Sequence, residues 1–266
     1  LARSNPLFIA LDYSKPQLVL EAAKRIQAQA VIPGCNDVSY ESCAWVAAQM
    51  GLPGLDHPDL NRTINHKLQF RQVGRDLGLS VPRLWEGGEC PSQSVIVKPV
   101  DAFSGKGVTV LRQPTAEALR QATELARGVS RTGEYVIEDF VDGQLYSHSV
   151  FLRGGRIIQD VVVIEHGTAN PFVVDTSRVV FDFPEALQGR MRRELEHLAQ
   201  SLQLGDGLLH AQLIVQGSQF WWIELTRRCP GDLYSQLIEL STGMPYVQYY
   251  LQPFVAHLKG SSPEPD

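Results

Sequence analysis

The segment VIVKPVDAFSGKGVTV, at positions 95–110, constrains this chain more strongly than any other stretch of its 266 residues. Two runs of β-forming residues flank a short loop, so the pattern predicts a strand, a glycine loop and a second strand. The loop contains Ser104, Gly105, Lys106 and Gly107, whose glycines allow backbone N–H groups to turn toward an anion such as a phosphate. Because β-forming residues resume after Gly107, this is not the strand-to-helix loop of a Walker A motif. An ordinary hairpin with an exposed lysine explains the pattern equally well.

Lys98 adds a second constraint, because it lies inside the first of these apolar runs and alternates with Val97 and Val95. A lysine in an apolar strand needs a partner, since burying an unpaired ammonium group is costly. A phosphate oxygen would serve, and so would a carboxylate on the neighbouring strand. The sequence leaves both partners open.

The rest of the chain predicts further strands and amphipathic helices. Residues 1–60 are typical of a small α/β unit, with strands at LFIAL and AVIPG and a helix from about Tyr40 to Met50 that Asn36 or Asp37 would cap. Further helices are predicted from His66 to Leu77, over TAEALRQATELARG, and from Pro184 to Leu202, where leucines recur at helical spacing. Strands are predicted at EYVIEDFV, LYSHSVFL, RIIQDVVVIEH, GLLHAQLIVQ and FWWIELT, and a last helix or two before a disordered SSPEPD tail. This order favours α+β lobes that follow a small α/β unit.

Composition excludes several classes of function. The formal net charge is -5 and no segment carries a dense run of Lys and Arg, so nucleic acid is not expected as a partner. No apolar stretch reaches the length of a membrane span, and no signal peptide is recognisable. The four cysteines show no metal-binding spacing, which is typical of reduced thiols in a cytoplasmic protein.

Three motifs in order resemble the ATP-grasp superfamily: VIVKPVDAFSGKGV, then YVIEDFVDGQLYS, then WIELTRR. The resemblance is closest to carbamoyl-phosphate-synthase-like and amino-acid-ligase-like members. It implies an α+β fold in which two lobes, residues 61–137 and 138–260, sandwich ATP after a small α/β domain at residues 1–60, with a tail at 261–266. The implied activity is that of a carboxylate–amine ligase, with ATP and Mg²⁺ as cofactors and small-molecule carboxylate and amine substrates as partners.

The same resemblance assigns nucleotide-binding residues. Lys67 and Lys98 would reach the ATP phosphates, while Lys106 lies in the glycine loop, with Ser104, Gly105 and Gly107, that would close over the triphosphate. In the EDFV segment, Glu138 would accept a hydrogen bond from the adenine amino group. Asp139, Phe140 and Val141 continue that segment along the purine slot, where backbone groups of Phe140 and Val141 would form the hinge side.

The metal residues implied by the family pattern are Gln212, Glu224 and Thr226. A three-residue turn at 217–219 would pair Gln212 with Glu224 and His210 with Thr226, and strand alternation would place Trp222 on the same face as Glu224. Gln and Thr are neutral where relatives usually offer a carboxylate and an amide, so the metal should bind weakly without nucleotide. Leu145 is a further departure, since many relatives have a ribose-binding glutamate there.

Arg228 and His210 are the implied catalytic residues, placed to stabilise oxyanion charge as an acyl phosphate forms and collapses. A salt bridge from Arg228 to Glu224 or Asp232, and a merely hydrogen-bonded strand histidine, are the structural alternatives. Arg178 is a weaker candidate for binding a substrate carboxylate.

Two other functions stay open at this point: a nucleotide-binding regulatory domain without ligase activity, and phosphorylation of a hydroxyl group. The apolar segment ELSTGMPYVQYYLQPF would suit either a homo-oligomer interface or the core.

Overall fold

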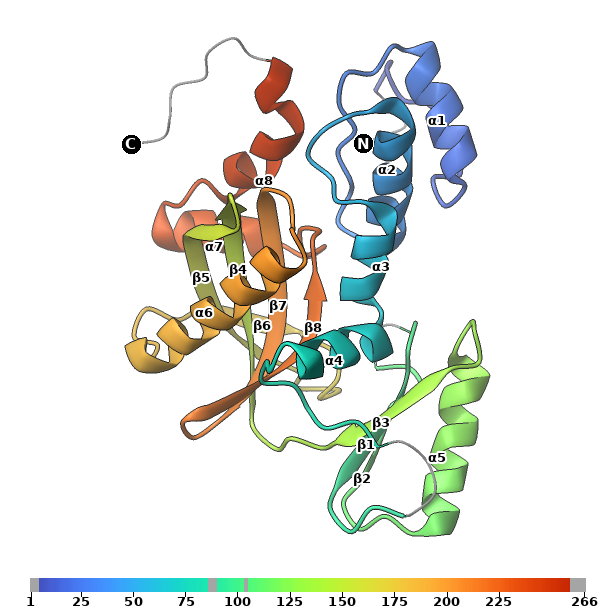
Figure 1. Cartoon of the computed structure of the whole chain (residues 1–266), viewed down its shortest axis with the longest axis vertical. Helices are drawn as coiled ribbons and strands as arrows, with labels where there is room; N and C mark the ends of the chain where they lie inside the picture. Colours follow the sequence, from blue (N-terminus) through green and yellow to red (C-terminus); the bar gives the residue numbers. More distant parts are fainter. Residues whose placement is uncertain (1–4, 86–89, 103–104, 259–266) are drawn as a thin grey trace.

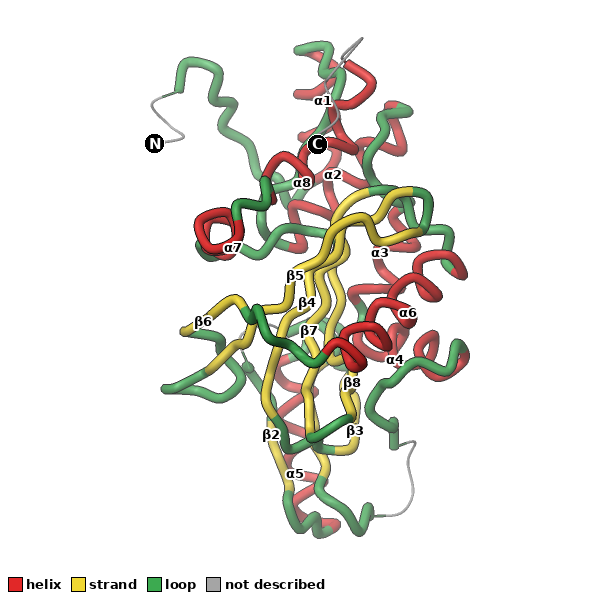
Figure 2. The backbone as a smooth tube through the Cα atoms, turned by 90° about the vertical axis from the view of Figure 1, so that its left-hand side faces the viewer, coloured by secondary structure: helices red, strands yellow, loops and turns green. Residues whose placement is uncertain are grey.

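The computed structural model describes residues 5–85, 90–102 and 105–258, so Ser104 and the SSPEPD tail lie outside the described residues. Helices combine with two antiparallel sheets, which confirms the predicted α+β class. The three-stranded sheet lies at one end of the molecule and α1 and α2 at the other, with the five-stranded sheet between them (Figures 1 and 2). No helix in these described ranges is both long and apolar enough to span a bilayer.

The amino-terminal part contains α1 (Pro16–Arg25), α2 (Asp37–Met50) and α3 (Pro58–Asn65), followed by α4 (Lys67–Asp76). Asn36 caps α2 as predicted, because its side chain accepts a hydrogen bond from the Ser39 N–H at 2.9 Å. The strands predicted at LFIAL and AVIPG are loops instead. An apolar run becomes a strand only where a neighbouring strand pairs with its backbone, and neither run finds one within the described chain.

The three-stranded sheet has the order β2-β1-β3 and comprises β1 (Val95–Pro99), β2 (Thr109–Leu111) and β3 (Tyr135–Asp139). Helix α5 (Ala116–Val129) covers one face, where Val97 packs against Ala122 and Ala126. Strand alternation sends Lys98 and Glu138 to the opposite face. The predicted strand–loop–strand pattern is therefore present, and its lysine faces away from the small core.

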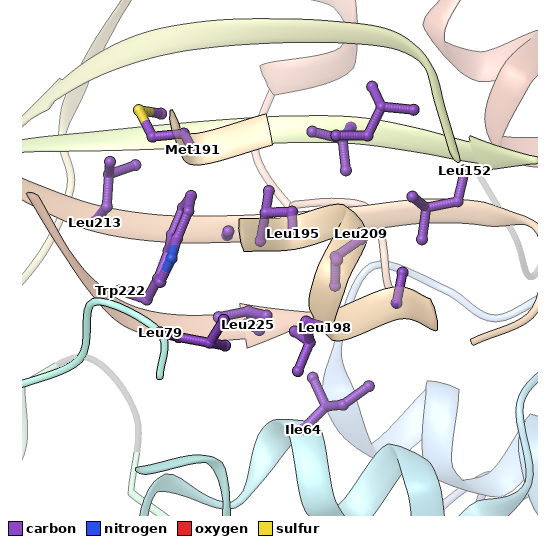
Figure 3. Packing of buried hydrophobic residues seen from close by; sticks show 14 of the residues in the cluster. Ile64, Leu79, Leu152, Met191, Leu195, Leu198, Leu209, Leu213, Trp222 and Leu225 are labelled. Atoms are coloured by element: carbon purple, nitrogen blue, oxygen red, sulfur yellow. The ribbon is translucent and has the colours of Figure 1, made fainter. Parts of the chain in front are cut away.

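The five-stranded sheet has the order β6-β5-β4-β7-β8. Its strands are β4 (Gln144–Arg153), β5 (Arg156–His166), β6 (Thr176–Val179), β7 (Gly207–Gln216) and β8 (Gln219–Thr226). Helix α6 (Glu185–Ser201) covers one face with the predicted apolar stripe, and Figure 3 shows Met191, Leu195 and Leu198 packed beside Leu209 and Trp222. Strand β6 was not predicted from the sequence.

Helices α7 (Tyr234–Thr242) and α8 (Tyr246–Val255), followed by the short 3₁₀ helix η2 (Ala256–Leu258), pack on the opposite face of this sheet. An aromatic cluster that includes Phe151, Tyr234, Tyr246, Tyr250 and Phe254 fills the space beneath them. On β4, residues 145, 147, 149 and 151 share this face, because alternate residues of a strand point the same way. The face therefore passes along β4 from Leu145, which lines a cavity, to Phe151 in the aromatic cluster.

Candidate functional site

A cavity of about 940 Å³ takes its walls from both sheets. Ile96, Lys98 and Glu138 line it from the smaller sheet, and Leu145, His210, Gln212, Ile214, Glu224 and Thr226 line it from the larger one, with Lys67 and Arg228 also present. Its size suits a small-molecule ligand, whose pockets are typically about 300–1,000 Å³. The fold thus brings most of the predicted site residues to one place.

Two buried cations share the carboxylate of Glu138. Lys98 Nζ lies 2.7 Å from Glu138 Oε2, and Arg71 Nε lies 2.9 Å from Oε1. Burial alone would raise the pKa of Glu138, but the charges of Arg71 and Lys98 outweigh it and hold that pKa below its usual value. Burial lowers the pKa of Lys98, although Glu138 opposes the shift. With the ordinary charges of these side chains, two cations face one anion, and the cation that lines the cavity is Lys98.

Hydrogen bonds to neighbouring residues fix the position of the EDFV segment. The Asp139 carboxylate accepts hydrogen bonds from Trp85 Nε1 at 2.7 Å and Gln93 Nε2 at 3.0 Å, and the Phe140 N–H donates to the Ser94 carbonyl at 2.9 Å. Val141 also lines the cavity. The contact of Glu138 with an adenine amino group stays a prediction, since its oxygens hold Lys98 and Arg71 here.

The glycine loop meets the loop after β5 at the cavity wall. Gly105 and Gly107 have φ angles of 68° and 72°, which favour glycine, and a Cβ atom at Gly105 would lie 2.7 Å from Phe172 Cβ. Lys106 is exposed, while Lys67 Nζ donates to the Ala102 carbonyl at 3.4 Å. Lys67 lines the cavity, and Lys106 directly follows Gly105, which lines it.

The β7–β8 register agrees with the sequence prediction, although the length of the turn does not. Gln212 pairs with Glu224 and His210 with Thr226, but the connection is two residues long and pairs Gln216 with Gln219. A bulge at Ile223 supplies the missing residue, and Arg71 donates to the freed Ile223 carbonyl at 2.6 Å.

The bulge also corrects the predicted position of Trp222. An extra residue shifts the alternation of β8, so Trp222 turns away from Glu224 and is fully buried in the core beneath α6. Ile223 and Glu224 then both face the cavity.

The three predicted metal residues differ in how well their oxygen atoms can serve as metal ligands. Gln212 Nε2 donates to Glu165 Oε2 at 2.8 Å, which leaves the Gln212 carbonyl oxygen for a cation. The Glu224 carboxylate lies close enough to Arg228 for its charge to help raise the pKa of that arginine. Thr226 Oγ1 lies 3.3 Å from Asp37 Oδ1. Among the described residues, no group of three or more His, Cys, Asp or Glu side chains could hold a metal. One carboxylate and one amide fit a Mg²⁺ ion that phosphates and water also coordinate.

Arg228 pairs with a residue that the sequence did not indicate. Its Nε lies 2.8 Å from Oδ1 of Asp37, at the start of α2, instead of pairing with Glu224 or Asp232. Burial alone would lower the pKa of Arg228, but its bonds to Asp37 raise it above its usual value. The adjacent Arg227 is turned away and pairs with buried Asp56 at 2.7 Å. Arg228 is thus the arginine of this pair that lines the cavity.

His210 is buried and lines the cavity, and its Nδ1 lies 2.8 Å from Ser149 Oγ. Burial, the Arg228 charge and His148 lower the pKa of His210 to about 3. A neutral imidazole carries no positive charge, so His210 does not have the charge with which the family resemblance would stabilise an oxyanion.

Three further residues were not predicted as site residues, namely Arg71, Asp37 and Glu165, and Asp37 had been considered only as a helix cap. Arg71 and Asp37 lie on helices, where a polar residue signals nothing unusual. Glu165 is the last residue but one of β5, and its burial could have been suspected only from the alternation of that strand. Arg178 is exposed on the edge strand β6.

Sequence comparison adds the family to this geometry. The model of the ATP-grasp domain matches residues 92–236, which is more than half of the chain. The chain therefore belongs to the ATP-grasp family. Among curated relatives, a formate-dependent phosphoribosylglycinamide formyltransferase from Pseudomonas aeruginosa is 28% identical over 147 residues, covering 52% of this chain. The chain spans about a third of the length of that relative, 34%.

Solved structures share the fold at low sequence identity. The L-amino acid ligase from Bacillus licheniformis superimposes with a TM-score of 0.73 at 20% identity over 94% of this chain and 61% of that one. A biotin carboxylase from Campylobacter jejuni, in complex with β-γ-ATP, gives a TM-score of 0.74 at 15% identity over 95% of this chain and 59% of that one. These likenesses show the ATP-grasp fold, with two α+β lobes, for nearly the whole described chain.

Proposed function

We propose that this chain is an ATP-dependent ligase, in which ATP phosphorylates a substrate carboxylate and an amine then displaces the phosphate from the acyl phosphate. Membership of the ATP-grasp family supports an ATP-dependent ligase in general, and we add that its substrates are a carboxylate and an amine. Both lobes contribute residues to the cavity, and we propose that the domains end at residues 60, 137 and 260.

The observation that carries the proposal is the unbalanced charge beside the cavity. Glu138, on the strand next to β1, pairs with Lys98, which is one of the two partners that the sequence left open. The same carboxylate also pairs with Arg71. Two cations against one anion leave a positive charge at a buried site, which is unfavourable unless an anion binds there. A nucleotide phosphate entering the cavity would supply that anion, with Lys67 beside it.

Mg²⁺ would be held by Glu224 and the Gln212 carbonyl oxygen, together with the nucleotide phosphates. The ion would neutralise charge on the transferring phosphoryl group. Arg228, fixed by Asp37, would stabilise negative charge on the reacting carboxylate. The glycine loop and the loop that carries Phe172 would exclude water, which protects an acyl phosphate from hydrolysis.

The rival function is that of a nucleotide-binding regulatory domain without ligase chemistry. The neutral Gln212 and Thr226, and Leu145 in place of a ribose-binding acid, favour it. Arg228 counts against it, because a domain that only binds nucleotide has no evident need for an oriented arginine beside the metal residues.

Replacing Lys98 by methionine is expected to weaken ATP binding at least tenfold without lowering the free energy of unfolding. Methionine keeps the volume of the side chain while removing the excess charge, so Arg71 and Glu138 remain as a balanced pair. ATP titration by calorimetry, with and without Mg²⁺, measures the affinity, and urea unfolding measures the stability. Glu224→Ala should bind ATP but lose the dependence of affinity on Mg²⁺.

A mixture of the twenty amino acids tests turnover, because it supplies both carboxylates and amines. ADP release that requires the mixture supports the ligase. Tight ATP binding without any ADP release would favour the regulatory domain. If Lys98→Met lost stability and kept its affinity for ATP, the lysine would be structural and the charge argument would be wrong.

A further inference from the structure

A chain of hydrogen bonds runs along the cavity wall from His210 to Glu165, and His210, Tyr234 and Glu165 line the cavity. Ser149 Oγ lies 2.8 Å from His210 Nδ1 and donates to Tyr234 Oη at 3.3 Å, and Tyr234 Oη lies 2.8 Å from Ser147 Oγ. Ser147 in turn is hydrogen-bonded to Glu165. All five side chains are buried, with relative exposures from 0% to 6%.

The direction of these bonds can be followed from the hydrogen atoms available. A serine hydroxyl carries one hydrogen, and Ser149 gives it to Tyr234. Ser149 Oγ must therefore accept the bond from His210, which places a hydrogen on Nδ1. Tyr246 Oη, 3.3 Å from the same oxygen, then donates to it as well.

The far end of the chain agrees with this direction. Glu165 accepts from Gln212 Nε2 at 2.8 Å, and as a carboxylate it also accepts from Ser147. Ser147 has then used its own hydrogen and must receive the bond from Tyr234. Every hydroxyl between His210 and Glu165 thus points toward Glu165.

The consequence falls on the other ring nitrogen of His210. A neutral imidazole with its hydrogen on Nδ1 has a lone pair on Nε2, and a histidine at pH 8 is neutral even at its ordinary pKa. Nε2 has no recorded hydrogen-bond partner among the described residues, and His210 lines the cavity.

We propose that Ser149 and Tyr234 lock His210 in the Nδ1–H tautomer, so that Nε2 accepts a hydrogen bond from an N–H group of the attacking amine. This inference rests on the proposed ligase function and assigns His210 to the amine. Carboxylate and phosphate oxygens only accept hydrogen bonds, so a bare Nε2 repels them. Of the reacting groups, the amine is the one that offers a hydrogen. Ser149 and Tyr234 are positioning residues, and their effect reaches the substrate through His210.

The tautomer is measured directly by ¹⁵N NMR of histidine-labelled protein at pH 8, with the signal of His210 assigned by its loss in His210→Gln. The chain has seven histidines, which keeps the spectrum simple. The wild-type signal is expected to show hydrogen on Nδ1. Ser149→Ala removes the acceptor for that hydrogen and should shift it to Nε2, and Tyr234→Phe should shift the tautomer in the same direction.

Tyr250→Phe is the matched control, because Tyr250 belongs to the same aromatic cluster but donates to the Pro33 carbonyl, outside the chain of bonds. It should leave the tautomer unchanged. In the ADP-release assay, Ser149→Ala should raise the half-saturating concentration of the amino-acid mixture about tenfold, which is the loss of one hydrogen bond, while the KM for ATP stays constant.

The NMR signal of His210 and the ADP-release assay separate three outcomes. A wild-type His210 with hydrogen on Nε2 overturns the lock, whether or not ADP is released. If His210 carries its hydrogen on Nδ1 but ADP release does not depend on amino acids, the ligase function is overturned, and with it the amine role of His210. If the hydrogen is on Nδ1 in the wild type but Ser149→Ala leaves the half-saturating concentration of the amino-acid mixture unchanged, only the amine role is overturned.

Discussion

Glu138→Gln is expected to lower the free energy of unfolding by about 3–5 kcal/mol, the usual effect of removing one partner from a buried ion pair. Glutamine keeps the shape of the side chain but leaves Lys98 and Arg71 as two buried cations without an anion. Lys98 can relieve part of the strain by losing its proton, since its pKa is already lowered, whereas an arginine stays charged. Urea unfolding measures the loss, which is a large fraction of a typical stability of 5–15 kcal/mol.

Asp142→Asn is the matched control, because Asp142 pairs with Arg112 at 2.8 Å on the surface, where both side chains are well exposed. Its unfolding midpoint should stay within experimental error of the wild type. If Glu138→Gln behaved like this control, the cluster would be solvated and the charge argument would fail. Should Glu138→Gln not fold, adding Lys98→Met is expected to restore folding, since it returns the cluster to one net positive charge.

Arg228→Ala is expected to lower kcat for amino-acid-dependent ADP release by about 10²–10³-fold, comparable to the loss of an oxyanion-stabilising donor. The effect should fall on kcat, because Arg228 is assigned to charge that develops during the reaction. Arg228→Lys should not restore the rate, since a lysine cannot reproduce the forked contact with Asp37, whose Oδ1 lies 2.8 Å from Nε and whose Oδ2 lies 3.4 Å from Nη2.

Asp37→Asn offers a graded companion, because it keeps the arginine and loosens its orientation. A decrease in kcat of about tenfold is expected, which corresponds to ~1.4 kcal/mol. Arg193→Ala, an exposed arginine on α6, should leave kcat unchanged. A wild-type rate in Arg228→Ala would assign the arginine to the structural pair with Asp37 alone.

Local patterns in the sequence accounted for most of the helices and strands. Strand alternation separated Lys98 from Val95 and Val97, although the structure was needed to show that α5 covers the valine face, and the helical spacing of leucines identified the buried side of α6. The runs LFIAL and AVIPG suit strands but are loops in the structure. Periodicity reports which residues suit a strand, but it does not report whether a partner strand is present.

The β7–β8 hairpin shows a prediction that succeeded by compensation. Counting from the chain predicted a three-residue turn, and the structure has a two-residue turn followed by a bulge at Ile223. Both give the same pairing of Gln212 with Glu224, yet only the bulge turns Trp222 into the core. A bulge leaves little mark on sequence periodicity, because it depends on what the freed carbonyl can bond, here Arg71.

The sequence by itself determined the family resemblance, through three motifs in order, and most of the individual strands and helices, because backbone alternation and glycine conformations are local properties. The grouping of the strands into two antiparallel sheets came from the structure. Only the tertiary structure decided the partners of the site residues. Arg71 reaches Glu138 across 67 residues of chain, and Arg228 reaches Asp37 across 191. Such contacts depend on how whole elements pack. The charge excess at Lys98, the ion pair of Arg228 with Asp37 and the direction of the hydrogen bonds from His210 to Glu165 therefore follow from the fold.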